Sequence, residues 1–82
     1  MLNKADAFAV LKKNILDILE DEVQENDITI EKSMVELGAN SLDIVQIISN
    51  TMRELKIKIP REELAKLKNI EELIDKMVKY GQ

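Results

Sequence analysis

Among the residue types that commonly perform chemistry, this sequence offers one serine in a distinctive setting and lacks cysteine and histidine. Ser41 lies in the segment Leu37–Asp43, which reads LGANSLD. A serine that begins a helix exposes its hydroxyl, and an anion attached there would lie near free backbone N–H groups at the positive end of the helix dipole. Gly38 permits a backbone turn that a side chain would obstruct. Ser41 is therefore a candidate for covalent attachment of an anionic group.

A simpler interpretation of the same residues stays open: Ser41 or Asn40 only caps a helix, because both residue types are common caps. Catalysis by the chain itself is not expected. Without cysteine or histidine it has no disulfide, no thiolate metal site and no Ser–His or Cys–His pair. Its carboxylates lie mostly in acidic runs with no acid–base partner set. We expect neither an enzyme nor a metal-binding protein.

Length and composition indicate a single small domain. The chain has 82 residues and only two aromatic residues, Phe8 and Tyr80. A core of Leu, Ile, Val and Met suits interlocking helices, so we expect an all-α fold over residues 1–82, too small for a deep cavity of its own. No apolar run has the length of a signal peptide or a membrane span. We expect a soluble, cytoplasmic monomer that binds no membrane.

The formal charge of −4 is unevenly distributed. Residues 1–52 hold ten acidic and four basic residues, a net charge of −6, whereas residues 53–82 hold six acidic and eight basic residues, a net charge of +2. The acidic part should repel nucleic acid and attract basic partners. An ordinary solvated acidic surface would give the same balance.

The spacing of apolar residues predicts three longer helices and one short helix. A first helix is expected over residues 5–22, where apolar residues recur at steps of three and four, and a long loop over residues 24–40 follows. A second helix is expected from Ser41 to about Leu55. After Pro60, a short helix from Arg61 to about Ala65 precedes a last one that begins after Asn69 and ends before Gly81. The apolar loop residues should pin the loop onto the bundle: Ile28, Ile30, Met34 and Leu37.

The second helix has more apolar surface than core packing needs. Its apolar residues cover an arc of about 220°, with Ile44, Ile48 and Leu55 in the middle. Leu42, Val45 and Met52 lie toward one edge and are candidates for partial exposure and contact with partners. Complete burial between neighbouring helices is an equally acceptable interpretation of the pattern.

The segment LGANSLD resembles the LGxDSL signature of the acyl carrier protein family, whose serine is modified by phosphopantetheine. The resemblance covers nearly the whole chain, including Met34 in the loop, the serine that opens the second helix and an IxIP entry into the short helix. It implies a four-helix carrier-protein bundle with a long loop between helices one and two. It also implies a non-catalytic carrier whose Ser41 receives 4′-phosphopantetheine from CoA through a phosphopantetheinyl transferase.

Two departures from the family pattern bear on partners. Asn40 stands where the family usually has aspartate, which keeps the cap but removes a negative charge offered to a basic transferase surface. Between Ser41 and Leu55 only Asp43 and Glu54 are acidic, whereas carriers of fatty acid synthesis are typically strongly acidic there. A less acidic recognition helix favours a different set of enzymes, such as those of polyketide biosynthesis.

The residues after the second helix resemble a more specialised group. Residues 59–65 and 68–73 read IPREELA and KNIEEL, similar to the IPRxEL and KNIxEL pattern of discrete donor carriers in polyketide β-branching cassettes. This implies a carrier of acetyl or malonyl thioesters that serves an acyltransferase, a ketosynthase or a hydroxymethylglutaryl-CoA-synthase-like enzyme. Proline at a helix start and an Asn cap also occur in many helical domains. The alternatives are a fatty acid carrier, a peptidyl or D-alanyl carrier, and an unmodified helical interaction module.

The resemblance also assigns a surface that partner proteins would read. It lies on the second helix and the loop before it. Arg61 and Lys68 could add positive charge beside the phosphopantetheine group, although a role as ordinary solvated surface residues is the alternative for these two. The expected contact residues are Ala39, Asn40, Leu42, Asp43, Val45, Gln46, Met52 and Arg61.

Overall fold

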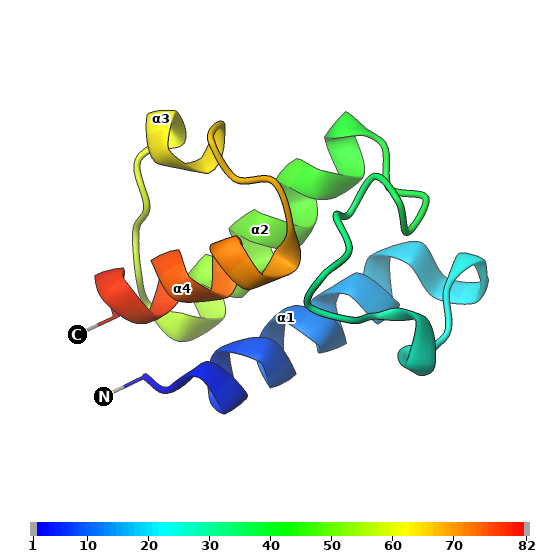
Figure 1. The fold of residues 1–82 in the computed structure, drawn as a ribbon, viewed down its shortest axis with the longest axis horizontal. Helices are drawn as coiled ribbons and strands as arrows, with labels where there is room; N and C mark the ends of the chain where they lie inside the picture. The colour runs from blue at the N-terminus through cyan, green and yellow to red at the C-terminus, as the bar shows by residue number, and fades with distance from the viewer. Residues whose placement is uncertain (1, 82) are drawn as a thin grey trace.

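The computed structural model describes residues 2–81 and consists of helices joined by loops (Figure 1). No strand occurs in these residues. The expected all-α fold, with three longer helices, one short helix and a long loop after the first, is confirmed. The helices are α1 (Lys4–Leu19), α2 (Ser41–Leu55), α3 (Arg61–Leu64) and α4 (Ile70–Tyr80), and two 3₁₀ turns, η1 (Glu20–Glu22) and η2 (Glu25–Asp27), follow α1.

The first helix is shorter at its carboxyl end than expected. Asn3 caps its start, because its side chain accepts a hydrogen bond from the N–H of Asp6 at 2.8 Å. The helix ends at Leu19 and not at Glu22, since Glu20 has φ +47° and leaves the helical conformation. The acidic residues of η1 thus lie beyond the negative end of the α1 dipole and not inside it.

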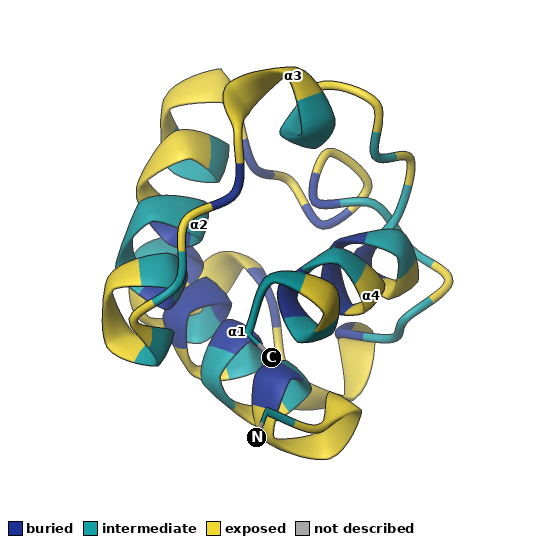
Figure 2. Ribbon diagram, turned by 90° about the vertical axis from the view of Figure 1, so that its left-hand side faces the viewer, coloured by how far each residue is buried: buried dark blue, intermediate teal, exposed yellow. Residues whose placement is uncertain are grey.

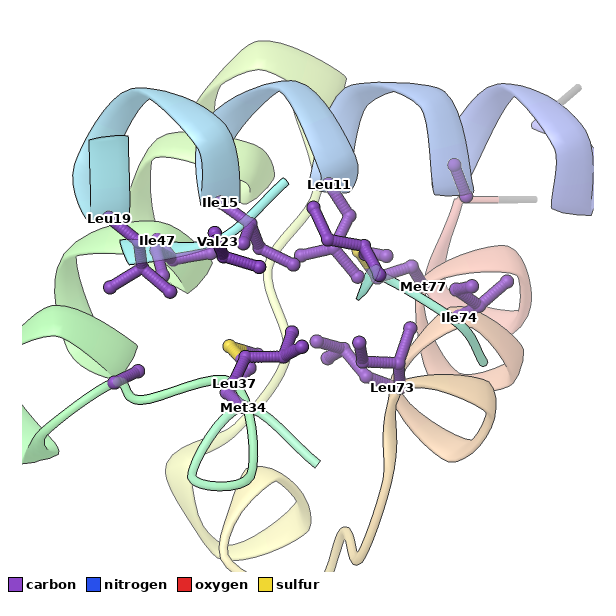
Figure 3. Packing of buried hydrophobic residues seen from close by; sticks show 14 of the residues in the cluster. Leu11, Ile15, Leu19, Val23, Met34, Leu37, Ile47, Leu73, Ile74 and Met77 are labelled. Carbon is purple, nitrogen blue, oxygen red and sulfur yellow. The ribbon is translucent and has the colours of Figure 1, made fainter. Parts of the chain in front are cut away.

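The core forms where α1 crosses α2 and α4, and the long loop closes it. Leu11 and Ile15 of α1 are fully buried, and Ile47 of α2 and Leu73 of α4 pack with them (Figure 3). Figure 2 shows the buried residues on the inward faces of the three longer helices. From the loop, Ile28, Met34 and Leu37 are buried as expected, and Ile30 is half-buried.

The buried face of α2 differs from the expectation. Ile47 and Thr51 are the fully buried residues, whereas Ile44, Ile48 and Leu55 are only half-buried. Threonine is a polar residue, so Thr51 was not counted in the arc of apolar residues. The arc therefore did not reveal that Thr51 belongs to the side of α2 that faces α1. Ile44 and Ile48 instead face the short helix α3 across a cavity, which leaves them incompletely covered.

A buried polar contact joins α1 to α2. The side-chain amide of Asn14 donates to the hydroxyl of Thr51 at 3.1 Å and to the carbonyl of Val10 at 3.0 Å, and the Thr51 hydroxyl donates to the carbonyl of Ile47 at 2.8 Å. Buried polar groups need such partners because an unpaired one keeps its full desolvation cost. The contact therefore favours one alignment of the two helices along their axes.

The start of α4 is tied to the loop through its backbone. The N–H groups of Ile70 and Glu71 donate to the carbonyls of Lys32 and Ile30, both at 2.9 Å. Asn69 caps the helix as expected, accepting from the N–H of Glu72 at 2.9 Å. The Glu72 carboxylate accepts from the N–H of Lys68 and not from that of Asn69, so the two residues do not form a reciprocal capping box. No helix within residues 2–81 is long and apolar enough to cross a membrane.

The contact between Asn14 and Thr51 can be tested with Thr51→Val, which preserves shape and removes the hydroxyl. We expect the free energy of unfolding, measured by urea denaturation, to fall by about 1–2 kcal/mol, because the buried Asn14 amide loses a partner. Asn50→Ala, at the half-buried neighbouring position, should change it by less than about 0.5 kcal/mol. Equal losses in both variants would show that the buried pair has no special role.

Candidate functional site

Ser41 is the first residue of α2, and its neighbours cap the helix. The side chain of Asn40 accepts from the N–H of Asp43 at 2.8 Å, and the carboxylate of Asp43 accepts from the N–H of Asn40 at 3.2 Å. This reciprocal capping box answers the question that the sequence left open. Asn40 is the cap, so the exposed hydroxyl of Ser41 is not used for capping.

A tight turn in the loop presents this end of α2. The carbonyl of Met34 accepts from the N–H groups of Leu37 and Ala39, and that of Val35 accepts from the N–H of Gly38, at 3.0–3.1 Å. Gly38 has φ +100°, a conformation that other residues rarely adopt. Because Met34, Leu37 and Ala39 are buried, the loop is held down immediately before Ser41.

The residues at this site fit a phosphate ester on Ser41. The hydroxyl is exposed, it stands on a helix start whose position is fixed by buried residues, and the first N–H groups of a helix have no intrahelical acceptors. The Asn40 side chain accepts from the N–H of Asp43, which leaves the N–H groups at the very start of the helix free to bind an anion. Within residues 2–81 no group of three or more acidic residues has the arrangement of a metal site. The exposed hydroxyl and the unpaired N–H groups at the helix start support attachment of an anionic group at Ser41.

The expected partner surface is mostly accessible, with one correction. Leu42 and Val45 are 75% and 60% exposed, as their place on the edge of the arc predicted. Asn40 and Gln46 are also exposed, whereas Asp43 and Met52 are half-buried. Ala39 is only 5% exposed, because its methyl group packs into the core below the turn, so its side chain is not available to a partner.

Val35 was not among the residues expected at this surface, yet it lies in the turn before α2 and is 68% exposed. Among residues 2–81, the large apolar side chains that are clearly exposed are Val35, Leu42 and Val45, and all three lie within six residues of Ser41 along the chain. A valine directly after the buried anchor Met34 was the available signal. Large exposed apolar side chains that gather at one place mark sites of contact with other molecules.

Arg61 lies on the opposite side of a cavity from the exposed face of α2. This cavity of about 550 Å³ separates α2 from α3, and Val45, Met52 and Arg61 are among its lining residues. Lys68 lines a smaller, separate cavity of about 130 Å³ together with Val35. The two basic residues therefore do not form one patch around a single cavity.

Comparison with known proteins identifies a family and several relatives. Residues 10–77 match the family described as phosphopantetheine attachment site. The chain is 40% identical over 74 residues to the polyketide biosynthesis acyl-carrier-protein AcpK of Bacillus subtilis, which covers 90% of this chain and 89% of that protein. It is 35% identical over 76 residues to an acyl carrier protein of Clostridium perfringens, covering 92% of this chain and 97% of the relative. The search of solved structures gave no significant match.

The roles of Asn40 and Ser41 in capping can be separated by measuring thermal unfolding with circular dichroism as the signal. Asn40→Ala should lower the free energy of unfolding by about 1 kcal/mol, because it removes the acceptor for the N–H of Asp43. Ser41→Ala should change it by less than about 0.5 kcal/mol. If Ser41→Ala were as destabilising as Asn40→Ala, the hydroxyl would be part of the cap.

Proposed function

The chain belongs to the acyl carrier protein family, which is defined by its phosphopantetheine attachment site, and from this we propose that Ser41 is the attachment residue and that the pathway served is polyketide biosynthesis. As a member of this family the chain is a non-catalytic carrier that holds 4′-phosphopantetheine covalently. When bound, this group supplies the terminal thiol that carries an acyl group as a thioester, a thiol that the cysteine-free chain lacks.

The observation that carries the assignment of Ser41 is its exposed, uncommitted hydroxyl at the capped start of α2. A phosphopantetheinyl transferase needs access to that oxygen, and the capping box of Asn40 and Asp43 keeps the helix start formed without it. The N–H groups at the helix start favour the negative charge of the phosphodiester. We also propose that residues 1–82 form one acyl carrier domain. This domain would act as a cytoplasmic monomer and bind neither nucleic acid nor membrane.

The chain is best interpreted as a donor carrier of acetyl or malonyl units for β-branching. The named relative from Bacillus subtilis belongs to polyketide biosynthesis, and the segments IPREELA and KNIEEL agree with the donor carrier pattern. On α2 the exposed residues include Gln46 and Arg53 in place of a continuous acidic face. Complementary charge selects partners, so such a face suits an acyltransferase, a ketosynthase or a hydroxymethylglutaryl-CoA-synthase-like enzyme that is not strongly basic.

A fatty acid synthesis carrier is the second candidate, because relatives named simply acyl carrier protein are 35% identical over almost the whole chain. A peptidyl or D-alanyl carrier would share the fold and Ser41 but would be loaded by an adenylating enzyme. For each of these functions, partners would approach the face that carries Asn40, Leu42, Asp43, Val45, Gln46 and Met52, with Arg61 across the cavity.

Attachment at Ser41 can be tested by incubating the chain with CoA and a broad-specificity phosphopantetheinyl transferase. We expect intact mass spectrometry to show a gain of one phosphopantetheine group in the wild type and none in Ser41→Ala, which lacks the oxygen that forms the ester. Ser33→Ala and Ser49→Ala are matched controls and should gain the same mass as the wild type. No gain in the wild type, or an equal gain in Ser41→Ala, would refute the assignment.

The pathway can be tested by loading acetyl onto the modified protein and offering it to two enzymes. We expect a hydroxymethylglutaryl-CoA-synthase-like enzyme of a β-branching system to accept the acetyl group at least about tenfold faster than a fatty acid condensing enzyme, a preference worth about 1.4 kcal/mol. Mass spectrometry of the carrier over time measures the loss of the acetyl thioester and so gives the rate of transfer to each enzyme. Transfer to the condensing enzyme alone would favour fatty acid synthesis.

A further inference from the structure

The charged side chains along α2 differ between its two ends. At the start of the helix, the carboxylate of Asp43 belongs to the capping box, and a side-chain carbon placed on Gly38 would lie 3.6 Å from a carboxylate oxygen of Glu22. At the other end, three exposed basic residues lie within six positions of the chain. These residues, which we name the basic strip, are Arg53, Lys56 and Lys58.

The carboxyl end of α1 adds more acidic residues beside the start of α2. The ammonium nitrogen of Lys13 lies 2.6 Å from a carboxylate oxygen of Glu54, and Asn14 bonds to Thr51, so the middle of α1 faces the last part of α2. In Figure 1, α1 therefore ends, and the acidic turn η1 follows, on the side of the molecule where α2 begins. Ser41 lies at this acidic end, whereas the basic strip lies at the opposite end of α2.

The basic strip has no acidic partner within residues 2–81. The acidic residue that interrupts it, Glu54, is paired with Lys13 of α1. The ion pairs of the described residues use other bases, namely Lys4, Lys12, Lys13, Lys66 and Lys76. The positive charge of the strip is therefore not neutralised by contacts within this part of the chain.

Lys56 occupies a backbone conformation that is unfavourable for a lysine. With φ +59° and ψ +43° it is in the left-handed region, which glycine or asparagine usually adopts after a helix. The N–H of Lys56 donates to the carbonyl of Arg53 at 3.2 Å and that of Ile57 to the carbonyl of Met52 at 3.0 Å, bonds that a glycine would also make. The lysine side chain is exposed and has no ion pair within residues 2–81. Strained residues of this kind gather at functional sites, which points to a use of this charge outside the fold.

Interaction with the helix dipole explains only part of the strip. Cations near the carboxyl end of a helix are favourable, but the effect falls off within the last turn. It therefore applies to Arg53 and Lys56, whereas Lys58 follows the end of α2 by three positions. Lys58 precedes the buried Ile59 and is itself exposed, so its charge is directed to solvent.

The two ends of α2 present their charges separately to a partner. The helix has 15 residues and is about 22 Å long at 1.5 Å per residue. Salt screens charges beyond about 8 Å at physiological ionic strength, so groups near the strip experience its positive charge more than the net charge of −4. A protein face can carry both signs of charge at this spacing. A nucleic acid or an anionic membrane presents one sign only, and the acidic end would repel it.

From this arrangement we propose that the basic strip is a docking surface for a patch of carboxylates on the enzyme that takes the acyl group from the carrier. The acidic end of α2 and the basic strip together fix the direction in which α2 lies on that enzyme. Arg53 can bind a carboxylate through two parallel hydrogen bonds, and Lys56 and Lys58 add point charges. The proposal rests on the proposed carrier function and adds to it the charge of the partner's face.

A triple variant tests the strip: Arg53→Gln, Lys56→Gln and Lys58→Gln. It is loaded with acetyl, with loading verified by intact mass, and offered to whichever of the two enzymes named above accepts acetyl from the wild type faster. We expect kcat/KM to fall about 5- to 20-fold at about 50 mM NaCl and less than about threefold at about 500 mM, since exposed charge pairs are screened by salt. The matched control Lys4→Gln, Lys66→Gln and Lys79→Gln changes the net charge equally, away from the strip. It should lose less than about twofold.

Two further measurements separate docking from folding. Lys56→Gly removes the charge and relieves the backbone, so kcat/KM should fall about two- to threefold while the midpoint of thermal unfolding stays the same or rises. A carbodiimide, which joins an amine directly to a carboxylate, should cross-link Lys56 or Lys58 to aspartate or glutamate residues of the enzyme and leave Lys79 unlinked.

Several outcomes would overturn the docking surface: an equal loss in the control triple variant, a loss that persists at high salt, no cross-link from the strip, or a loss of stability in Lys56→Gly. Binding of the wild type, but not of the strip variant, to phosphatidylserine vesicles or to a short RNA, with equal transfer rates, would assign the strip to those anions instead. If neither enzyme accepts acetyl from the wild type, the proposed function fails and the docking surface with it. Acceptance at unchanged rates by the strip variant refutes the docking surface alone.

Discussion

The packing of α1 between α2 and α4 is the contact on which the rest of the structure depends. Leu11 and Ile15 are fully buried there, and each side chain of this kind contributes about 1.5–3 kcal/mol when removed from water. In a chain of this size such contacts are few, and a small domain buries a smaller share of its surface than a large one does. The buried hydrogen bond between Asn14 and Thr51 adds alignment to this packing, because hydrophobic contacts alone are not directional.

The long loop belongs to this core as much as the helices do. Ile28, Met34 and Leu37 fill the space that α1, α2 and α4 leave, and the start of α4 donates two backbone hydrogen bonds to the loop. Fixing an irregular segment costs conformational entropy, which the burial of these side chains offsets. The consequence is local to the site: the turn at Gly38 is held, so α2 begins at one place and Ser41 is presented there.

Apolar spacing and cap residues predicted most of this fold. The bounds of α2 and α4 agree with it because Asn40 and Asn69 cap where such residues should, and the loop anchors were visible as isolated apolar residues in a polar stretch. The end of α1 and the buried face of α2 were not predictable in this way. Glu20 has an unusual backbone conformation for its residue type, and the partner that Thr51 finds in its buried position, Asn14, lies on another helix.

The candidate site follows the same division between local and tertiary information. Ser41 and the exposure of Leu42 and Val45 depend on the start and the outer face of a single helix, which sequence describes well. The burial of Ala39 and the exposure of Val35 depend on how the turn that contains both residues packs on the core. The cavity beside α2 depends on α3, whose position is set by tertiary contacts and not by helix propensity. Thus α2 has one side packed on α1 and one side that borders the cavity, and Ser41 lies at the start of the helix that carries both.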